Sequence, residues 1–201
     1  MLFSLRSPHE IFIKKRTRRI IMQEIKRIKR ELVYQGSILD FYEDTMLLPN
    51  GNTEKWDFVS HRMGAACVLA VKPDGKILMV RQYRNALERE TLEVPAGKRD
   101  SVNEDTAICA QRELEEETGY HAGKLEKLLS LKSTVAFCDE LIDVYLATDL
   151  VKIGEQHLDE SEEIDIESWE LKDLMDMCYA GKLQDAKTVA AIMAYAARKN
   201  Q

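Results

Sequence analysis

Three glutamates near the middle of the chain have a spacing that suits metal chemistry. Glu113, Glu116 and Glu117 stand at positions i, i+3 and i+4, which places three carboxylates on one face of a helix. Like charges this close repel one another, so the cluster costs stability unless a cation lies among them. An all-oxygen ligand set suits Mg²⁺ or Mn²⁺ better than Zn²⁺. A solvated glutamate-rich helix is the alternative that this run alone leaves open.

The residues around these glutamates favour a helix. Ala107, Ala110 and Leu114 form a narrow apolar stripe on a second face, so the helix can pack beneath a sheet while its acidic face looks outward. Both ends carry residues typical of helix termini. The expected assignments are Asn103 as the N-cap, Glu104 and Asp105 in the first turn, and Gly119 as the left-handed residue at the end.

Length and composition favour one globular unit. The chain has 201 residues, 45% of them hydrophobic, and no linker rich in Pro, Gly or Ser divides it, so it can bury one sizeable core. The cysteines form no Cys-x-x-Cys pair and the histidines show no zinc spacing, which favours free thiols in a reducing compartment. The longest apolar run, residues 65–71, is too short to cross a bilayer. We therefore expect a cytoplasmic protein with no membrane contact.

Charge is distributed unevenly along the chain. The net charge of −6 argues against general nucleic-acid binding, yet residues 1–28 form a basic N-terminal extension. Targeting or contact with an anionic surface is one interpretation of this extension. The favoured alternative is that translation starts at Met22, which would make residues 1–21 adventitious.

Downstream of the extension, hydrophobic patterning predicts strands first and helices last. Residues 29–62 read as a small antiparallel sheet, and Pro73-Asp74-Gly75 predicts a hairpin turn. The last third has apolar residues at helical spacing. The expected strands are residues 31–36, 38–48, 55–60, 65–71, 76–83, 91–94, 125–133 and 141–147.

The segment from Gly97 to Tyr120 resembles the Nudix box. That pattern reads Gly, five residues, Glu, seven residues, then Arg-Glu-aliphatic-any-Glu-Glu-any-Gly, and it is matched from Glu104 onward. One departure is that six residues separate Gly97 from Glu104. The resemblance implies an α+β Nudix fold, in which a mixed β-sheet is sandwiched between helices, and it implies that residues 63–201 form the hydrolase domain.

Further strings resemble the ADP-ribose pyrophosphatase branch of this family. They are Val80-Arg81-Gln82-Tyr83-Arg84, Leu92-Glu93-Val94-Pro95-Ala96-Gly97 and Asp185-Ala186-Lys187-Thr188 with the residues that follow. The branch implies hydrolysis of ADP-ribose to AMP and ribose 5-phosphate. It also implies metal ions held by Glu113, Glu116 and Glu117 together with the backbone carbonyl of Ala96.

An acidic loop supplies the catalytic carboxylate in that branch. Here the loop is residues 156–164, where Glu162 is the best match by position and Glu160 the second. Either residue could orient or deprotonate a metal-bound water. A charged surface loop without a catalytic role is the alternative. Arg112 is expected to give structural support by pairing with Glu104 or a box carboxylate.

Three more positions carry over as substrate contacts. The resemblance implies that Arg84 contacts the substrate phosphates, which suits a guanidinium fork, and that Glu93 touches the distal ribose. Trp56 falls near an aromatic that stacks on adenine from the partner subunit, which would make the N-terminal sheet a dimerisation element. The alternatives are a surface arginine and a tryptophan in ordinary packing.

One departure affects the substrate. Val135 stands where this branch usually has a proline, so the loop over residues 133–140 has a freer backbone. ADP-ribose remains the first choice, followed by UDP-glucose or GDP-mannose and then by dinucleoside polyphosphates. A Nudix-fold protein that binds a nucleotide without cleaving it is the alternative from another functional class. The complete glutamate set favours catalysis.

Overall fold

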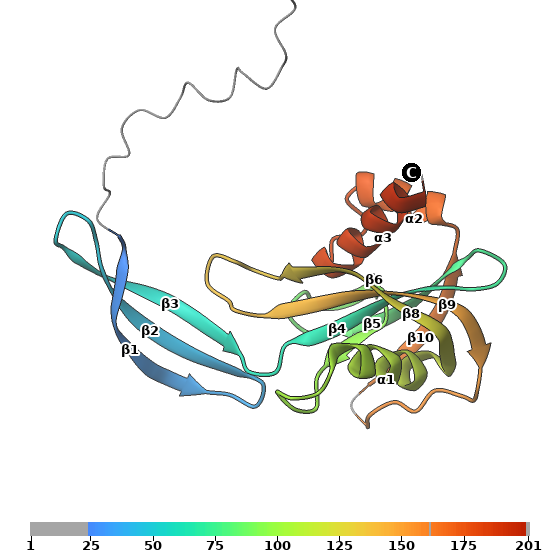
Figure 1. The fold of residues 1–201 in the computed structure, drawn as a ribbon, viewed down its shortest axis with the longest axis horizontal. Coiled ribbons are helices and arrows are strands. Elements are labelled where there is room, and N and C mark those ends of the chain that lie inside the picture. The colour runs from blue at the N-terminus through green and yellow to red at the C-terminus, as the bar shows by residue number, and fades with distance from the viewer. Residues whose placement is uncertain (1–23, 161, 200–201) are drawn as a thin grey trace, which may run out of the picture.

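The computed structural model describes residues 24–160 and 162–199. Residues 1–21, Met22 and most of the predicted basic extension therefore lie outside the described residues. Three strands form the small antiparallel sheet that was expected near the N-terminus, in the order β1 (Lys26–Gln35), β2 (Leu39–Leu47) and β3 (Thr53–His61). Most of this sheet lies to one side of the main sheet (Figure 1), and the end of β3 contacts the loop over residues 133–140. Its first strand takes in residues 26–28, which the sequence pattern had assigned to the extension.

The main sheet is mixed, as the expected fold class requires. Strand β4 pairs in parallel with β9, and its other pairings are antiparallel. The central order is β10-β5-β4-β9-β8, with β6 beside β5 and β7 beside β4. The strands are β4 (Ala65–Val71), β5 (Ile77–Arg84), β6 (Arg89–Glu93), β7 (Ala96–Lys98), β8 (Tyr120–Lys132), β9 (Leu141–Lys152) and β10 (Ile164–Trp169).

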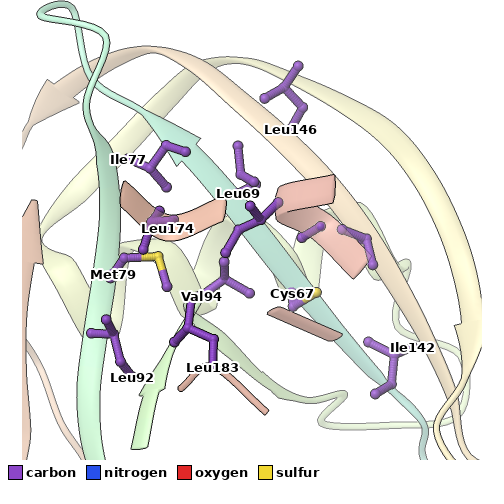
Figure 2. Close-up of a cluster of buried hydrophobic side chains, with 13 residues drawn as sticks. Cys67, Leu69, Ile77, Met79, Leu92, Val94, Ile142, Leu146, Leu174 and Leu183 are labelled. Atoms are coloured by element: carbon purple, nitrogen blue, oxygen red, sulfur yellow. The ribbon is translucent and has the colours of Figure 1, made fainter. Parts of the chain in front are cut away.

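Helices cover both faces of this sheet. Helix α1 (Thr106–Thr118) lies on one face, and α2 (Leu171–Tyr179) and α3 (Ala186–Lys199) lie on the other (Figure 1). Alternate side chains of β4 point to opposite faces of the sheet. Because helices cover both faces, both sets of side chains are buried. Cys67 and Leu69 join the cluster beneath α2 and α3 (Figure 2), whereas Val68 and its small neighbours pack against α1.

Two expectations drawn from composition can be compared with the described residues. All four cysteines are free thiols, and burial raises the pKa of the Cys67 thiol to about 12. None of the helices in residues 24–160 and 162–199 has the length and apolar character needed to cross a membrane.

Helix α1 begins later than predicted. Its N-cap is Asp105, whose carboxylate accepts a hydrogen bond from the backbone N–H of Ala107 at 2.7 Å, so Asn103 as the N-cap was wrong. Glu104 lies before the helix because a turn closes between its N–H and the carbonyl of Ser101 at 3.1 Å. This turn lies within the segment between Gly97 and Glu104, which is one residue longer than the pattern.

The predicted end of α1 is confirmed. Gly119 has φ 70° and caps the helix by donating its N–H to the carbonyl of Glu115 at 2.8 Å. A Cβ at this position would lie 2.3 Å from the carbonyl oxygen of Gly154. Gly119 therefore meets two constraints, a positive φ and a close approach of a second backbone segment.

Gly119→Ala should lower the free energy of unfolding more than Gly181→Ala does. Gly181 has φ 68°, but a Cβ added to it would have no heavy atom within 4 Å among the described residues, so that variant isolates the backbone cost of about 1 kcal/mol. Gly119→Ala adds a clash that should cost about 1–3 kcal/mol more. Urea unfolding of both variants measures the difference, and equal losses would contradict the clash.

Candidate active site

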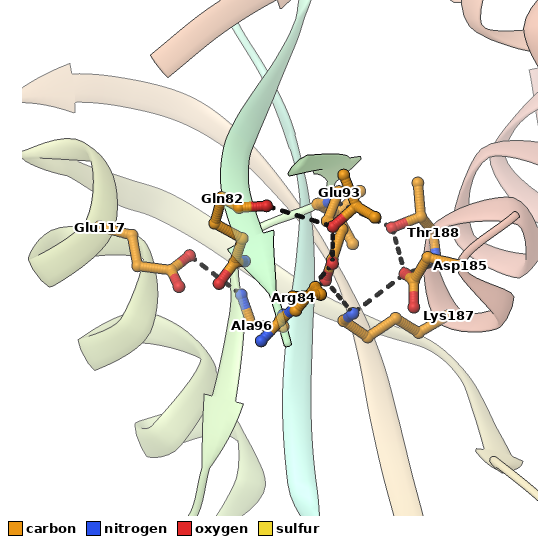
Figure 3. A network of polar contacts seen from close by, with 10 residues as sticks. Gln82, Arg84, Glu93, Ala96, Glu117, Asp185, Lys187 and Thr188 are labelled. Atoms are coloured by element: carbon orange, nitrogen blue, oxygen red, sulfur yellow. Dashed lines mark hydrogen bonds and ion pairs between the residues drawn. The ribbon is translucent and has the colours of Figure 1, made fainter. Parts of the chain in front are cut away.

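Two of the three helix glutamates lie inside the protein. Glu113 and Glu117 are only 8% and 3% exposed, whereas the side chain of Glu116 is 42% exposed. A carboxylate oxygen of Glu117 accepts a hydrogen bond from the backbone N–H of Ala96 at 3.1 Å (Figure 3). The acidic face of α1 therefore points toward β7, and the expectation that it looks outward was wrong.

Burial changes the acidity of these two side chains. Burial and the charge of Glu113 raise the pKa of Glu117 to about 8. Burial likewise raises the pKa of Glu113 to about 7, although Arg112 opposes the shift. Carboxylic acids that retain protons near neutral pH are typical of functional sites. Burying them lowers the stability of the fold, and proteins tolerate this loss where the groups have a function.

Gly97 provides the space that Glu113 occupies. A Cβ at Gly97 would lie 2.2 Å from the carboxyl carbon of Glu113 and equally close to one of its oxygens. Any side chain at this position would displace the glutamate or the strand β7 that carries Gly97. This contact gives a physical basis for the supporting role predicted for Gly97.

Arg112 links the helix to the loop before it. Its guanidinium donates to Glu113 at 2.8 Å and to Glu116 at 3.0 Å. It also donates to the carbonyl of Lys98 at 3.0 Å and to Glu104 at 3.4 Å. The structure therefore contains both pairings that were expected for Arg112, with Glu104 and with the box carboxylates.

The donor set fits a hard divalent cation in its chemistry. Across the described residues, no three Asp, Glu, His or Cys side chains are close enough together to enclose an ion, and Arg112 holds the carboxylates of Glu113 and Glu116. The buried pair of Glu113 and Glu117 nevertheless places carboxyl oxygens next to the backbone of Ala96. A cation bound there would lower both raised pKa values and offset the cost of burial.

The acidic loop after β9 is attached to the end of α1. The side-chain amide of Gln156 donates to the carbonyls of Glu117 at 2.7 Å and Ile164 at 3.0 Å. The backbone N–H of His157 donates to the carbonyl of Glu116 at 2.8 Å. These bonds fix the loop next to the glutamates. The sequence did not predict them, because a contact from a side-chain amide to a helix carbonyl has no characteristic spacing.

Glu162 is oriented by a short turn in this loop. It exchanges hydrogen bonds with the backbone of Asp159, donating at 2.9 Å through its own N–H and accepting at 3.0 Å through its carboxylate. The charge of Glu162 contributes to the raised pKa of both Glu113 and Glu117, so it lies within electrostatic range of them. Glu160 is exposed.

A buried ion network lies on the other side of Ala96 (Figure 3). Glu93 is 2% exposed, and its two oxygens accept from Arg84 at 2.7 and 2.6 Å. Thr91 donates to the same carboxylate at 2.6 Å, and Lys187 pairs with it as well. Burial alone would raise the pKa of Glu93, but Arg84 and Lys187 outweigh it and lower the pKa to about 2.

Two cavities connect these groups. One of about 260 Å³ is lined by Arg84, Lys187, Ala96 and Gly97. Another of about 390 Å³ lies between Arg84 and Glu162. Arg84 belongs to both, so the structure brings the arginine predicted to bind phosphate, the strand of Ala96 and the acidic loop together around one region.

The loop that contains Val135 is attached to the end of β3. The backbone N–H of Val59 donates to the carbonyl of Phe137 at 2.7 Å, and Asp139 accepts from the N–H of His61 at 2.8 Å. Val135 itself is 84% exposed and lines neither of the two cavities above. Glu140, at the end of the loop, does line the smaller one.

Trp56 is the predicted site residue that this chain does not bring to the others. It lies on β3 in the separate sheet, is 42% exposed, and donates its indole N–H to Glu54 at 3.3 Å. It lines neither of the two cavities that Arg84 lines next to Ala96 and next to Glu162. A role in the site would therefore require a second copy of the chain.

Glu117→Gln should stabilise the metal-free protein at about pH 8. The pKa of Glu117 is raised from 4.5 to about 8 on folding, so its stability cost grows as pH rises through that interval, and glutamine removes the cost. We expect a gain of about 1–3 kcal/mol at pH 8 that shrinks toward pH 5. Thermal unfolding with chelator measures the gain. Glu115→Gln on the same helix is the control, and an equal gain in both variants would contradict the assignment.

Comparisons with known proteins agree with this geometry. A family model for the NUDIX domain matches residues 60–192. ADP-ribose pyrophosphatase of Bacillus subtilis (strain 168) is 41% identical over 170 residues, which cover 84% of this chain and 91% of that protein. The methanol dehydrogenase activator of Bacillus methanolicus is 39% identical with the same coverage of both chains.

A solved structure shares the fold. The crystal structure of an ADP compounds hydrolase aligns with a TM-score of 0.74 and 22% sequence identity, covering 87% of this chain and 93% of the other. Nudix hydrolases generally use divalent metals. The family model spans the box, both cavities and the first half of α3. With buried box glutamates on a helix beneath a mixed sheet, the chain belongs to the Nudix family.

Proposed function

We propose that this chain is a divalent-metal-dependent pyrophosphatase that hydrolyses ADP-ribose to AMP and ribose 5-phosphate. Mg²⁺ is the proposed metal and Mn²⁺ the alternative. The observation that carries the proposal is the buried pair of Glu113 and Glu117 beside Ala96, next to cavities lined by Arg84. The relatives named ADP-ribose pyrophosphatase support the choice of substrate.

The site contains groups for each part of this reaction. Glu113, Glu116, Glu117 and the carbonyl of Ala96 would hold the metal, which when bound neutralises the pyrophosphate and acidifies water. Arg84 would bind a phosphate oxygen. Hydrolysis joins the oxygen of one water to one phosphorus and breaks the bond from that phosphorus to the bridging oxygen.

The proton released by the attacking water needs an acceptor. We assign this role to Glu162, with Glu160 as the second choice. Glu162 is placed by its turn with Asp159 and acts electrostatically on Glu113 and Glu117. Glu93 is the proposed contact to the distal ribose. Because its carboxylate is already held by Arg84, Thr91 and Lys187, any such contact would share those bonds.

Other substrates remain as alternatives. UDP-glucose and GDP-mannose follow ADP-ribose, because Val135 replaces the proline typical of the branch, and dinucleoside polyphosphates follow these. Some relatives are named GDP-mannose pyrophosphatase at 28% identity. A non-catalytic nucleotide-binding role is the least favoured, since all three helix glutamates are present.

We also propose a homodimer formed through β1, β2 and β3. This sheet carries large exposed apolar side chains, including Leu32, Val33 and Tyr34 at 52%, 59% and 68% exposure. A partner on this sheet would bury them, and we propose that Trp56 of each copy then contributes to the site of the other. Sedimentation equilibrium should give twice the chain mass, and a monomer at assay concentration would contradict the proposal.

A substrate panel tests the proposed function directly. ADP-ribose, UDP-glucose, GDP-mannose and a diadenosine polyphosphate are incubated with Mg²⁺, with Mn²⁺ and with chelator, and the products are separated by chromatography. AMP and ribose 5-phosphate from ADP-ribose, lost on chelation, are the expected result. If another compound of the panel is cleaved in preference to ADP-ribose, that compound becomes the proposed substrate. If no compound is cleaved with either metal, the assignment as an enzyme is overturned.

Glu162→Gln should lower kcat by about 10²–10⁴-fold with little change in KM, because a general base acts in the transition state. Glu160→Gln is the matched control from the same loop and should lose far less. A larger loss in Glu160→Gln would exchange the two roles. Unchanged kcat in both variants would remove this loop from the chemistry.

A further inference from the structure

Lys187 is a buried cation for which the sequence pattern suggested no role. It lies in the first turn of α3, and its side chain is 11% exposed. Its ammonium pairs with the carboxylate of Glu93 and with Asp185 at 3.0 Å (Figure 3). Asp185 also accepts a hydrogen bond from the backbone N–H of Thr188 at 3.0 Å. The ammonium is therefore fixed from two sides.

Arg84 shares Glu93 with this lysine. Its Nε and Nη2 reach the two oxygens of Glu93 at 2.7 and 2.6 Å, in a forked arrangement. Its Nη1 has no hydrogen-bond or ion-pair partner among the described residues. One edge of the guanidinium is thus held by the protein, and the remaining nitrogen is left for a ligand in the adjoining cavities.

The charges around Glu93 explain why a second cation matters. Glu93 alone would neutralise Arg84, because a bidentate carboxylate pair cancels most of the field of a guanidinium. Without Lys187, the carboxylates of Glu93 and Asp185 would both act on Arg84. With Lys187 paired to both, two negative charges are divided between two cations. Arg84 then keeps more of its positive potential for an anionic oxygen, while the fork still fixes its orientation.

We propose that Lys187 is a positioning residue for phosphate binding, which acts by sharing Glu93 with Arg84. The inference rests on the proposed pyrophosphatase function and deepens it. Lys187 also lines the cavity that reaches Ala96 and Gly97, so direct contact with the substrate is the competing explanation. Because the ammonium is already engaged by two carboxylates, the structure favours the indirect role.

A double-mutant cycle separates the two explanations. Lys187→Gln should lower kcat/KM for ADP-ribose by about 10–100-fold when Arg84 is present. In an Arg84→Gln background the same change should alter kcat/KM by less than about threefold, because the group through which Lys187 acts is missing. Lys187→Arg keeps the cation and should recover most of the activity.

Lys172→Gln is the matched control. Lys172 lies on α2, has a side chain that is 81% exposed, and pairs with Asp176, so its loss removes one positive charge without touching Glu93 or a cavity lined by Arg84. It should retain wild-type kcat/KM. Thermal unfolding is measured for every variant. Lys187→Met, whose apolar side chain has a similar length, replaces Lys187→Gln if that variant is unfolded at the assay temperature.

Two results would overturn the inference. The first is wild-type kcat/KM in Lys187→Gln. The second is an equal loss with and without Arg84, which would make Lys187 a direct ligand of the substrate. The same cycle can be measured as ADP-ribose affinity by titration calorimetry without turnover. If the wild-type protein binds ADP-ribose but does not cleave it, the result counts against the proposed function alone. The ADP-ribose affinities of the variants still decide the role of Lys187.

Discussion

Burial of two neighbouring acidic side chains is the constraint on which this structure depends. Glu113 and Glu117 lie one turn apart on α1, are almost inaccessible to solvent, and have pKa values raised to about 7 and about 8. Burial of two acids side by side is unfavourable for folding, so the surrounding structure must hold them in place. The arrangement becomes favourable when a cation joins it, which links the stability of the fold to the proposed chemistry.

The fold holds these acids in two ways. The backbone of the sheet approaches α1 closely on one side, and the charge of Arg112 restrains the glutamates on the other. The small side chains of Ala66 and Ala70 on β4 allow α1 to pack closely on the sheet. Gly97 on β7 leaves room for a carboxylate that any Cβ would exclude. Arg112 restrains the exposed edge of the glutamates, and the loop anchored by Gln156 covers the end of the helix. Each contact is local, yet together they join three separate segments of the chain.

Much of this arrangement could be predicted from spacing, and the rest could not, for physical reasons. The positions of the glutamates identified α1, its apolar stripe and the left-handed Gly119, because helical periodicity is a local property. Their burial was missed, since which face meets the sheet depends on β7, a strand of 3 residues. The N-cap lies at Asp105 because Glu104 is held in a turn with Ser101 before the helix begins. The network around Lys187 joins β5, β6 and α3, and no local pattern reports contacts between residues so far apart in sequence.

Proton release on metal binding tests the central claim most directly. Titration calorimetry with Mg²⁺ or Mn²⁺ at about pH 7, repeated in buffers of different ionisation enthalpy, counts the protons that each bound ion displaces. If Glu113 and Glu117 hold protons until a cation arrives, about one to two protons should be released per ion, and fewer as pH rises toward about 9. Binding without proton release at neutral pH would show that these carboxylates are already ionised, and it would contradict the account.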